Sequence, residues 1–206
     1  MSQTLSSTRG CRGLGEADRL AAIVAERSLE ELLDSVDLYD IPAYAGSEIL
    51  PGLFQGGTED DDVVQRARRD RWAHESPYDV VVTLYASASP APWGVEELRF
   101  GFLDSALDGV DAVRVVRASR FAYQRWLDGD TVLIRCQAGL NRSGLVTALV
   151  LVQAGLTPAQ AVSVIRERRA GAALFNEHFV RWLLEHGAAA VARSPRGRLG
   201  SSDEAA

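Results

Sequence analysis

Three short apolar runs alternate along this chain with longer amphipathic or apolar segments. Residues 79–84, 98–103 and 131–134 have the length and composition of buried strands. Residues 110–127 and 143–154 have the hydrophobic patterns of helices, the second apolar all round. Strands that alternate with helices of this length are typical of α/β proteins. We therefore predict an α/β fold with a central, mostly parallel, twisted sheet flanked by helices.

Weaker signals extend this pattern on both sides. Residues 16–36 are apolar at helical spacing, and Pro51-Gly52 forms a turn between extended pieces at 47–50 and 53–55. Further helices are predicted after the acidic run 59–62, from the N-cap candidate Thr157 with Pro158 to about Arg169, and from Asn176 to His186, closed by Gly187.

The length and composition fit one domain. A chain of 206 residues with 47% hydrophobic content can bury a substantial core. Both ends, by contrast, are rich in small and polar residues that cannot bury enough area to order themselves. We predict one domain over residues 15–187, including an N-terminal helix, between flexible tails at 1–14 and 188–206.

Charge and cysteine content exclude several classes of protein. All 22 basic residues are arginines, and 28 acidic residues give a net charge of −6, so we expect no nucleic-acid partner. No segment has the roughly 20 apolar residues of a membrane helix, and the N-terminus lacks the apolar core of a signal peptide. Cys11 and Cys136 are too few and too far apart for a disulfide scaffold or a zinc site. We expect a soluble cytoplasmic protein with no metal and no membrane insertion.

The stretch after the third strand combines a nucleophile with an anion-binding turn. Cys136 ends the strand, a loop containing Gly139 follows, and a helix begins near Arg142 and Ser143. Ligands of open α/β sheets lie at the carboxyl ends of strands, where a tight loop entering a helix turns backbone N–H groups inward. A helix N-terminus and a nearby arginine also stabilise a thiolate. Arg142 can donate two parallel hydrogen bonds to a bound phosphate.

These residues carry a resemblance to a known family. Cys136-x5-Arg142-Ser143 matches the C-x5-R-[ST] signature of the cysteine-dependent protein tyrosine and dual-specificity phosphatases. The resemblance spans about residues 45–185 and implies a dual-specificity-phosphatase-like fold. Segment 49–56 is similar to the early hairpin of the family, and Arg169, Asn176 and Phe179 are similar to its helix pair after the loop.

The family also implies a general-acid aspartate some thirty residues before the nucleophile, after a strand. Asp104 follows the apolar run 98–103 and precedes Cys136 by 32 residues. Asp108 is the alternative acid. The resemblance implies that the Cys136 thiolate attacks phosphorus while Asp104 protonates the leaving oxygen. Asp104 then activates the water that hydrolyses the phosphocysteine, while the Ser143 hydroxyl stabilises the departing thiolate.

The phosphate oxygens would be held by the Arg142 side chain and by backbone amides, so the implied mechanism needs neither a metal nor a cofactor. The predicted phosphate-binding residues are Gln137, Ala138, Gly139, Leu140, Asn141 and Arg142.

One position departs from the family. The residue before the nucleophile is usually a histidine that braces the loop, and here it is Arg135. The Arg135 side chain either faces the loop and adds positive charge there or, as strand alternation favours, forms an ion pair elsewhere.

We favour a phosphatase acting on phosphoproteins that carry phosphotyrosine, or phosphoserine and phosphothreonine as well. A phosphoinositide, nucleotide or RNA phosphatase is the second hypothesis, although residues 137–141 add no cation to the loop that a polyanionic substrate would favour. A non-catalytic phospho-binding module is the third, and the presence of nucleophile, arginine and candidate acid weakens it. A thiol enzyme of the rhodanese or arsenate-reductase type would require neither Asp104 nor Ser143.

Overall fold

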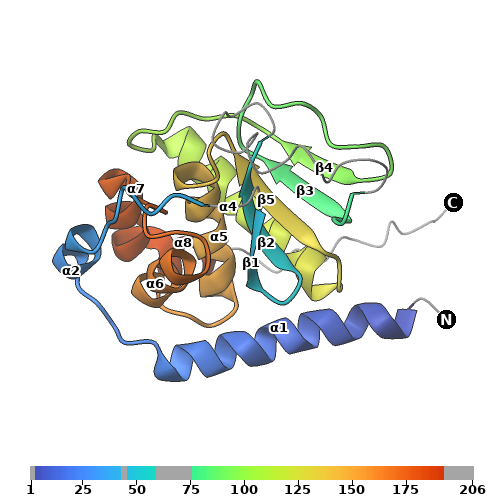
Figure 1. The fold of residues 1–206 in the computed structure, drawn as a ribbon, viewed down its shortest axis with the longest axis horizontal. Coiled ribbons are helices and arrows are strands. Elements are labelled where there is room, and N and C mark those ends of the chain that lie inside the picture. The colour runs from blue at the N-terminus through green and yellow to red at the C-terminus, as the bar shows by residue number, and fades with distance from the viewer. Residues whose placement is uncertain (1–2, 43–45, 59–75, 193–206) are drawn as a thin grey trace, which may run out of the picture.

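A five-stranded sheet forms the centre of the molecule (Figure 1). The computed structural model describes residues 3–42, 46–58 and 76–192, with side chains from residue 13 onward. An antiparallel hairpin lies at one edge, and the other three strand pairs are parallel, which confirms the predicted α/β fold. The strand order is β1 (Gly46–Leu50), β2 (Leu53–Gly57), β5 (Val132–Cys136), β3 (Val80–Thr83) and β4 (Glu96–Arg99).

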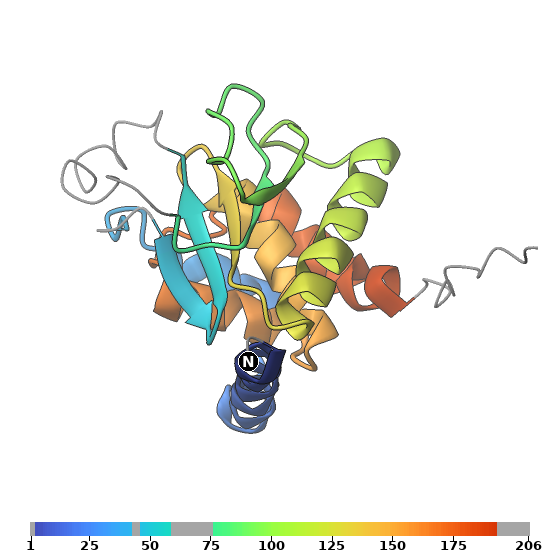
Figure 2. The same ribbon diagram turned by 90° about the vertical axis from the view of Figure 1, so that its right-hand side faces the viewer.

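Helices that follow the strands in the chain cover the sheet. The central one is α5 (Asn141–Gln153), which contacts β2 and β5 and lies between α4 (Gly109–Leu127) and α6 (Pro158–Arg168) (Figures 1 and 2). Ten of the thirteen α5 residues are buried, as its apolar sequence predicts. Thr157 caps α6 through a capping box with Gln160, and Pro158 occupies the first helical turn, also as predicted.

The N-terminal helical region differs from the prediction of one helix over 16–36. A first helix, α1 (Gln3–Ile23), covers most of the segment 1–14 that we predict to be a loose tail. It packs along the bottom of the molecule in Figure 1, where Gly13 lies so close to the Trp126 indole that a side chain could not fit. A second helix, α2 (Leu29–Asp34), starts at Ser28, whose capping box with Glu31 explains the break.

Two other boundaries are also corrected. The fourth strand ends at Arg99 and not at residue 103, because its partner β3 ends at Thr83. Gly187 does not close the last helix: α7 (Glu177–Trp182) continues through a π-helical turn (Leu183–Gly187) into α8 (Ala188–Ala192). Arg120 of α4 donates to the Ala190 carbonyl at 2.9 Å, so a partner from another helix stabilises this extension.

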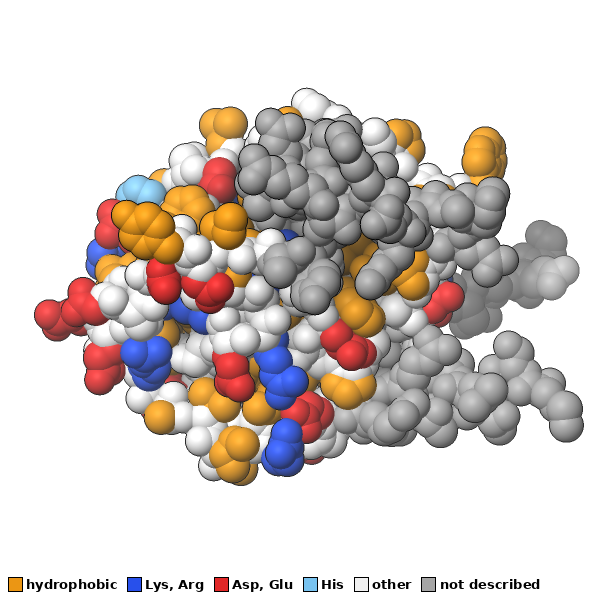
Figure 3. Space-filling view, in the orientation of Figure 1, with side chains coloured by type: hydrophobic (Ala, Val, Ile, Leu, Met, Phe, Trp, Pro, Cys, Tyr) orange, Lys and Arg blue, Asp and Glu red, His pale blue; other side chains and the backbone are white. Residues whose placement is uncertain are grey.

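The predicted helix after the acidic run 59–62 lies outside the described residues, as does the segment 193–206. The assignment of residues 15–187 to one domain stays a prediction. On the face seen in Figure 3, acidic and basic side chains are interspersed. Within the described ranges, no helix is long and apolar enough to cross a membrane, and no three acidic, histidine or cysteine side chains are grouped to hold a metal ion.

Candidate active site

The predicted nucleophile is the last residue of the central strand β5. Cys136 is 2% exposed, and the chain after it turns through residues 137–140 into α5. The Cys136 sulfur lies 3.3 Å from the hydroxyl oxygen of Ser143 in the first turn of that helix. The strand end and the helix start therefore place a thiol, a hydroxyl and the positive end of a helix dipole together.

A glycine permits the tight turn of this loop. Gly139 has a φ of 73°, a conformation that residues with a side chain rarely adopt. A Cβ at Gly139 would lie 2.4 Å from backbone atoms of Gly56 and Gly57 at the end of β2. The loop therefore rests directly on the neighbouring strand, and only glycine fits at this contact.

Donors outside the loop bind its carbonyl oxygens. The Gln55 side chain and Arg169 Nε each donate to the Gly139 carbonyl at 3.1 Å, and Thr58 N donates to the Gln137 carbonyl at 2.9 Å. Because a peptide group is planar and its N–H points opposite its C=O, the N–H groups of Ala138 and Leu140 point away from these outer donors. This is the arrangement of an anion-binding nest.

Arg169 also supplies positive charge beneath the loop. Burial lowers the pKa of its guanidinium to about 10, although the nearby Cys136 and Tyr78 favour the charged form. The side chain thus remains a cation at neutral pH. It also donates to the Ser47 hydroxyl at 3.2 Å, so it ties the loop to β1.

The Arg142 side chain is anchored on one side and free on another. Its Nη1 lies 3.3 Å from the Phe102 carbonyl and 3.4 Å from the Leu84 carbonyl, and the guanidinium carbon lies 5.4 Å from the centre of the Tyr85 ring. Its Nε is buried and has no hydrogen-bond partner among the residues that the structure describes. A buried donor without a partner is costly, and a bound oxyanion would satisfy it.

The structure brings Asp104 to the loop. Asn141 in the loop donates to one carboxylate oxygen of Asp104 at 3.1 Å, and Asn176 donates to the other at 2.7 Å. Asp108, the alternative acid, accepts from Asp111 N at 2.7 Å and caps α4. Of the two candidate acids, Asp104 therefore lies beside the loop, whereas Asp108 lies at the start of α4.

Arg135 points away from the loop, as strand alternation predicts. Its Nε donates to the Thr83 hydroxyl at 2.9 Å, and its Nη2 donates to the Ser89 carbonyl at 2.6 Å and pairs with Glu97 at 3.2 Å. Burial alone would raise the pKa of Glu97, but hydrogen bonds from Thr83 and Ala91 and the Arg135 cation together hold it below its usual value. Arg135 thus links β3 and β4 to the segment that follows β3. Leu84 and Tyr85, at the start of that segment, contact Arg142.

Sequence reasoning missed several of these contacts. Gln55 marks only the end of a predicted extended piece, and Tyr85 only follows the predicted strand 79–84. Gln55 nevertheless donates to Gly139, and the Tyr85 ring lies beside Arg142. In the sequence, only the family resemblance draws attention to Arg169 and Asn176, and it does not indicate which residues they contact. A polar residue inside a buried strand, such as Gln55, is the one available signal, because buried amides need hydrogen-bond partners.

Comparison with known proteins agrees with this geometry. Residues 115–189, which include β5, the loop and α5, match the family described as dual specificity phosphatase, catalytic domain. Over this segment the chain is similar to that family. The match contains Cys136, Arg142 and Ser143, whereas Asp104 precedes it.

A curated member of the wider phosphatase group also matches. It is a Dictyostelium discoideum protein described as a "Probable protein tyrosine phosphatase type IVA A", 48% identical over 42 residues. The match covers 20% of this chain and spans a quarter of the length of that protein.

Solved structures of other proteins share the fold. Human DUSP28 is 21% identical with a TM-score of 0.56, and the match covers 70% of this chain and 94% of that one. OH1 from the Orf virus, described as a tyrosine phosphatase, is 20% identical with a TM-score of 0.58 over 78% of this chain and 98% of that one. At these identities the likeness concerns the fold.

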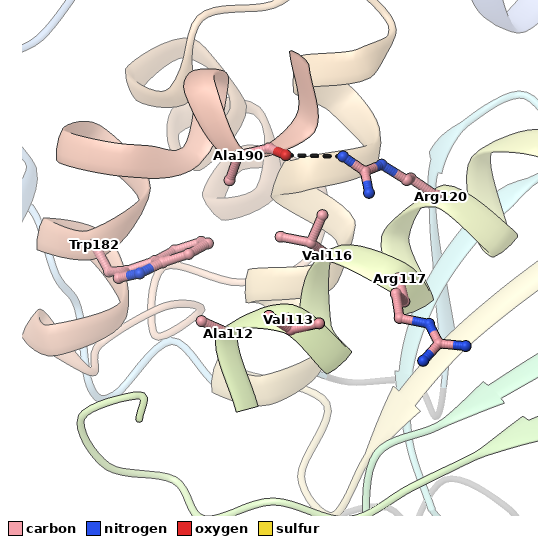
Figure 4. A pocket seen from close by; sticks show the side chains of 7 residues that line it. All are labelled: Ala112, Val113, Val116, Arg117, Arg120, Trp182 and Ala190. Carbon is pink, nitrogen blue, oxygen red and sulfur yellow. Dashed lines mark hydrogen bonds between the residues drawn. The ribbon is translucent and has the colours of Figure 1, made fainter. Parts of the chain in front are cut away.

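A separate pocket of about 260 Å³ lies between α4 and the C-terminal helices (Figure 4). Trp182 and Val116 line it together with Arg120, whose guanidinium bonds to Ala190. The described residues that line this pocket include none of the predicted site residues. The arrangement around Cys136 is thus distinct from it.

Proposed function

We propose that the chain is a phosphatase that hydrolyses phosphomonoesters of phosphoproteins through a phosphocysteine intermediate. The observation that supports this most is the convergence of three groups. These are the sulfur of Cys136, the carboxylate of Asp104 and the Nε of Arg142, which has no partner among the described residues, and all three belong to or contact one loop. This is the constellation that nucleophilic phosphoryl transfer needs.

In the first step, the Cys136 thiolate forms a bond to phosphorus while the bond from phosphorus to the leaving oxygen breaks. Asp104 gives its proton to that oxygen. Arg142 and the loop N–H groups of residues 137–142 bind the other phosphate oxygens. These donors stabilise the negative charge that develops on the phosphate oxygens in the transition state.

In the second step, Asp104 takes a proton from water, and the water oxygen bonds to phosphorus as the sulfur–phosphorus bond breaks. The Ser143 hydroxyl, 3.3 Å from the sulfur, donates to the departing thiolate. The loop thus returns to its starting state with inorganic phosphate bound.

We propose phosphotyrosine as substrate, with phosphoserine and phosphothreonine as well. Side chains of residues 137–141 carry no charge, which disfavours a polyanionic substrate such as an inositol phosphate or nucleotide. The related OH1 is described as having "triple substrate specificity", so members of this fold are not restricted to one class. A cytoplasmic location stays a prediction.

The test compares the purified wild-type protein with Cys136→Ser and Asp104→Ala on p-nitrophenyl phosphate. We expect hydrolysis by the wild type, none by Cys136→Ser, and slower hydrolysis by Asp104→Ala. The full loss of about 10²–10⁴-fold is expected on a substrate with a more basic leaving group, such as phenyl phosphate. Full activity of Cys136→Ser would rule out the proposed chemistry. A wild-type protein that binds phosphopeptides without hydrolysing them would support a non-catalytic module, and a preference for inositol phosphates over phosphopeptides would support the second class of substrate.

A further inference from the structure

The chain contains two asparagines, Asn141 and Asn176, and both donate hydrogen bonds to Asp104. Asn141 is 2% exposed and belongs to the phosphate loop, where it begins α5. Asn176 is the N-cap of α7. The two amide groups hold the two carboxylate oxygens of Asp104 separately, at 3.1 and 2.7 Å.

Backbone groups fix the orientation of both amides. The Asn141 side-chain oxygen accepts from Asn176 N at 3.0 Å, and the Asn176 side-chain oxygen accepts from His178 N at 3.0 Å. A backbone N–H can only donate, so each amide oxygen must face it. The NH₂ end of each amide must then face Asp104, which leaves neither asparagine free to rotate without losing a bond.

We propose that Asn141 and Asn176 are positioning residues that hold the general acid at the phosphate loop. This inference rests on the proposed function and extends it. Asp104 lies on the segment after β4, which makes no further sheet pairing once Phe100 N has bonded to the Thr83 carbonyl at 3.0 Å. The amide pair ties this segment to α5 and α7, so the carboxylate is in place before substrate binds.

The amide pair is compatible with proton transfer. Each carboxylate oxygen has two lone pairs, and each receives one of these amide bonds, so a lone pair on each oxygen remains for the transferred proton. Holding the acid in one position raises its effectiveness, because a displacement of about 1 Å can cost about 10²-fold in rate.

An effect that acts through Asp104 must depend on the leaving group. Phenyl phosphate releases a strongly basic phenolate that needs protonation, whereas p-nitrophenyl phosphate releases a weakly basic one. Loss of the amide pair should therefore slow phenyl phosphate hydrolysis much more. General damage to the phosphate loop would slow both substrates alike.

The test uses Asn176→Ser and Asn176→Asp, because serine and aspartate both cap helices and so retain the start of α7. Neither can donate to Asp104 as the amide does, and the aspartate adds a repelling charge. We expect kcat for phenyl phosphate to fall about tenfold or more and kcat for p-nitrophenyl phosphate to change less than about threefold. Glu177→Ala, an exposed neighbour in α7, is the matched control and should leave both rates unchanged.

A double-mutant cycle with Asp104→Ala completes the test. In the Asp104→Ala variant, which lacks the carboxylate, adding Asn176→Ser should cause no further loss of kcat for phenyl phosphate. An equal loss in both backgrounds, or equal losses on both substrates, would show that Asn176 acts only on the fold and would overturn the proposal. Activity of Cys136→Ser would overturn the proposed function, independently of the result for Asn176. If the activity of Asp104→Ala did not depend on the leaving group, both the assignment of Asp104 as the acid and the positioning role of the two asparagines would be wrong.

Discussion

The hydroxyl oxygen of Ser143 lies 3.3 Å from the sulfur of Cys136. Both side chains are buried, and the serine hydroxyl is a polar neighbour of the sulfur. A hydrogen bond to a charged group contributes about 1.5–3 kcal/mol, which corresponds to about 10–100-fold in rate if it forms only as the thiolate leaves.

We predict that Ser143→Ala slows the second step by about this factor while the first step stays fast. The phosphocysteine would then accumulate, and p-nitrophenol release would show a burst followed by a slow steady state. Stopped-flow kinetics with p-nitrophenyl phosphate measures both phases. A variant that shows no burst and a uniformly slow first turnover would contradict the assigned role of Ser143.

Gly139→Ala should inactivate the protein without unfolding it. The added methyl group would lie 2.4 Å from backbone atoms of Gly56 and Gly57 and 2.6 Å from Arg169, so the loop must shift. We expect kcat/KM to fall about a hundredfold, as misplacement of reacting groups by about 1 Å does. Steady-state kinetics and a thermal melt on the same sample separate loss of activity from loss of fold.

Gly94→Ala provides the control for this change. Gly94 has a similar φ of 86°, but a Cβ there would meet no atom within 4 Å. It should lose about 1–2 kcal/mol of stability from backbone strain and retain its activity. Equal activity losses in the two variants would mean that strain, and not the contact with β2, accounts for the effect at Gly139.

Glu97→Gln should destabilise the protein near neutral pH by about 2 kcal/mol, because buried Arg135 loses its charged partner. The pKa of Glu97 is lowered in the folded state, so its contribution is present above the usual carboxyl range of about pH 4 and is lost as the pH falls through the folded value. The difference between wild type and variant should therefore narrow in acid. Urea unfolding at pH 7 and near pH 3 measures it; a difference that stays constant would contradict the charge-based account.

Much of this fold follows from local signals in the sequence. The apolar runs predict the parallel strands, and Thr157 with Pro158 predicts the start of α6, because these signals act over a few residues. Cys136 and Arg142 could be identified for a similar reason, since the strand, loop and helix that position them are continuous in the chain.

The remaining features depend on contacts between distant segments. Gly187 has the sequence of a helix end, yet Arg120 from α4 stabilises the helical turns beyond it. Asn141 and Asn176 lie 35 residues apart, and no local pattern indicates that both amides reach Asp104. Strand alternation predicts that the Arg135 side chain points away from the loop. It does not predict that Glu97 is its partner, because that pairing depends on strand register.

The bonds from Arg169 and Asn176 also determine when the site is completed during synthesis. A ribosome releases the chain from its N-terminus, so Cys136 and the whole of α5 emerge before Arg169, one of the two donors to the Gly139 carbonyl, and before Asn176, the N-cap of α7. A nascent chain that ends within α6 carries the nucleophile but neither Arg169 beneath it nor Asn176 beside the acid. The complete arrangement around Cys136 and Asp104 therefore forms only in chains whose C-terminal helices have been made and have folded.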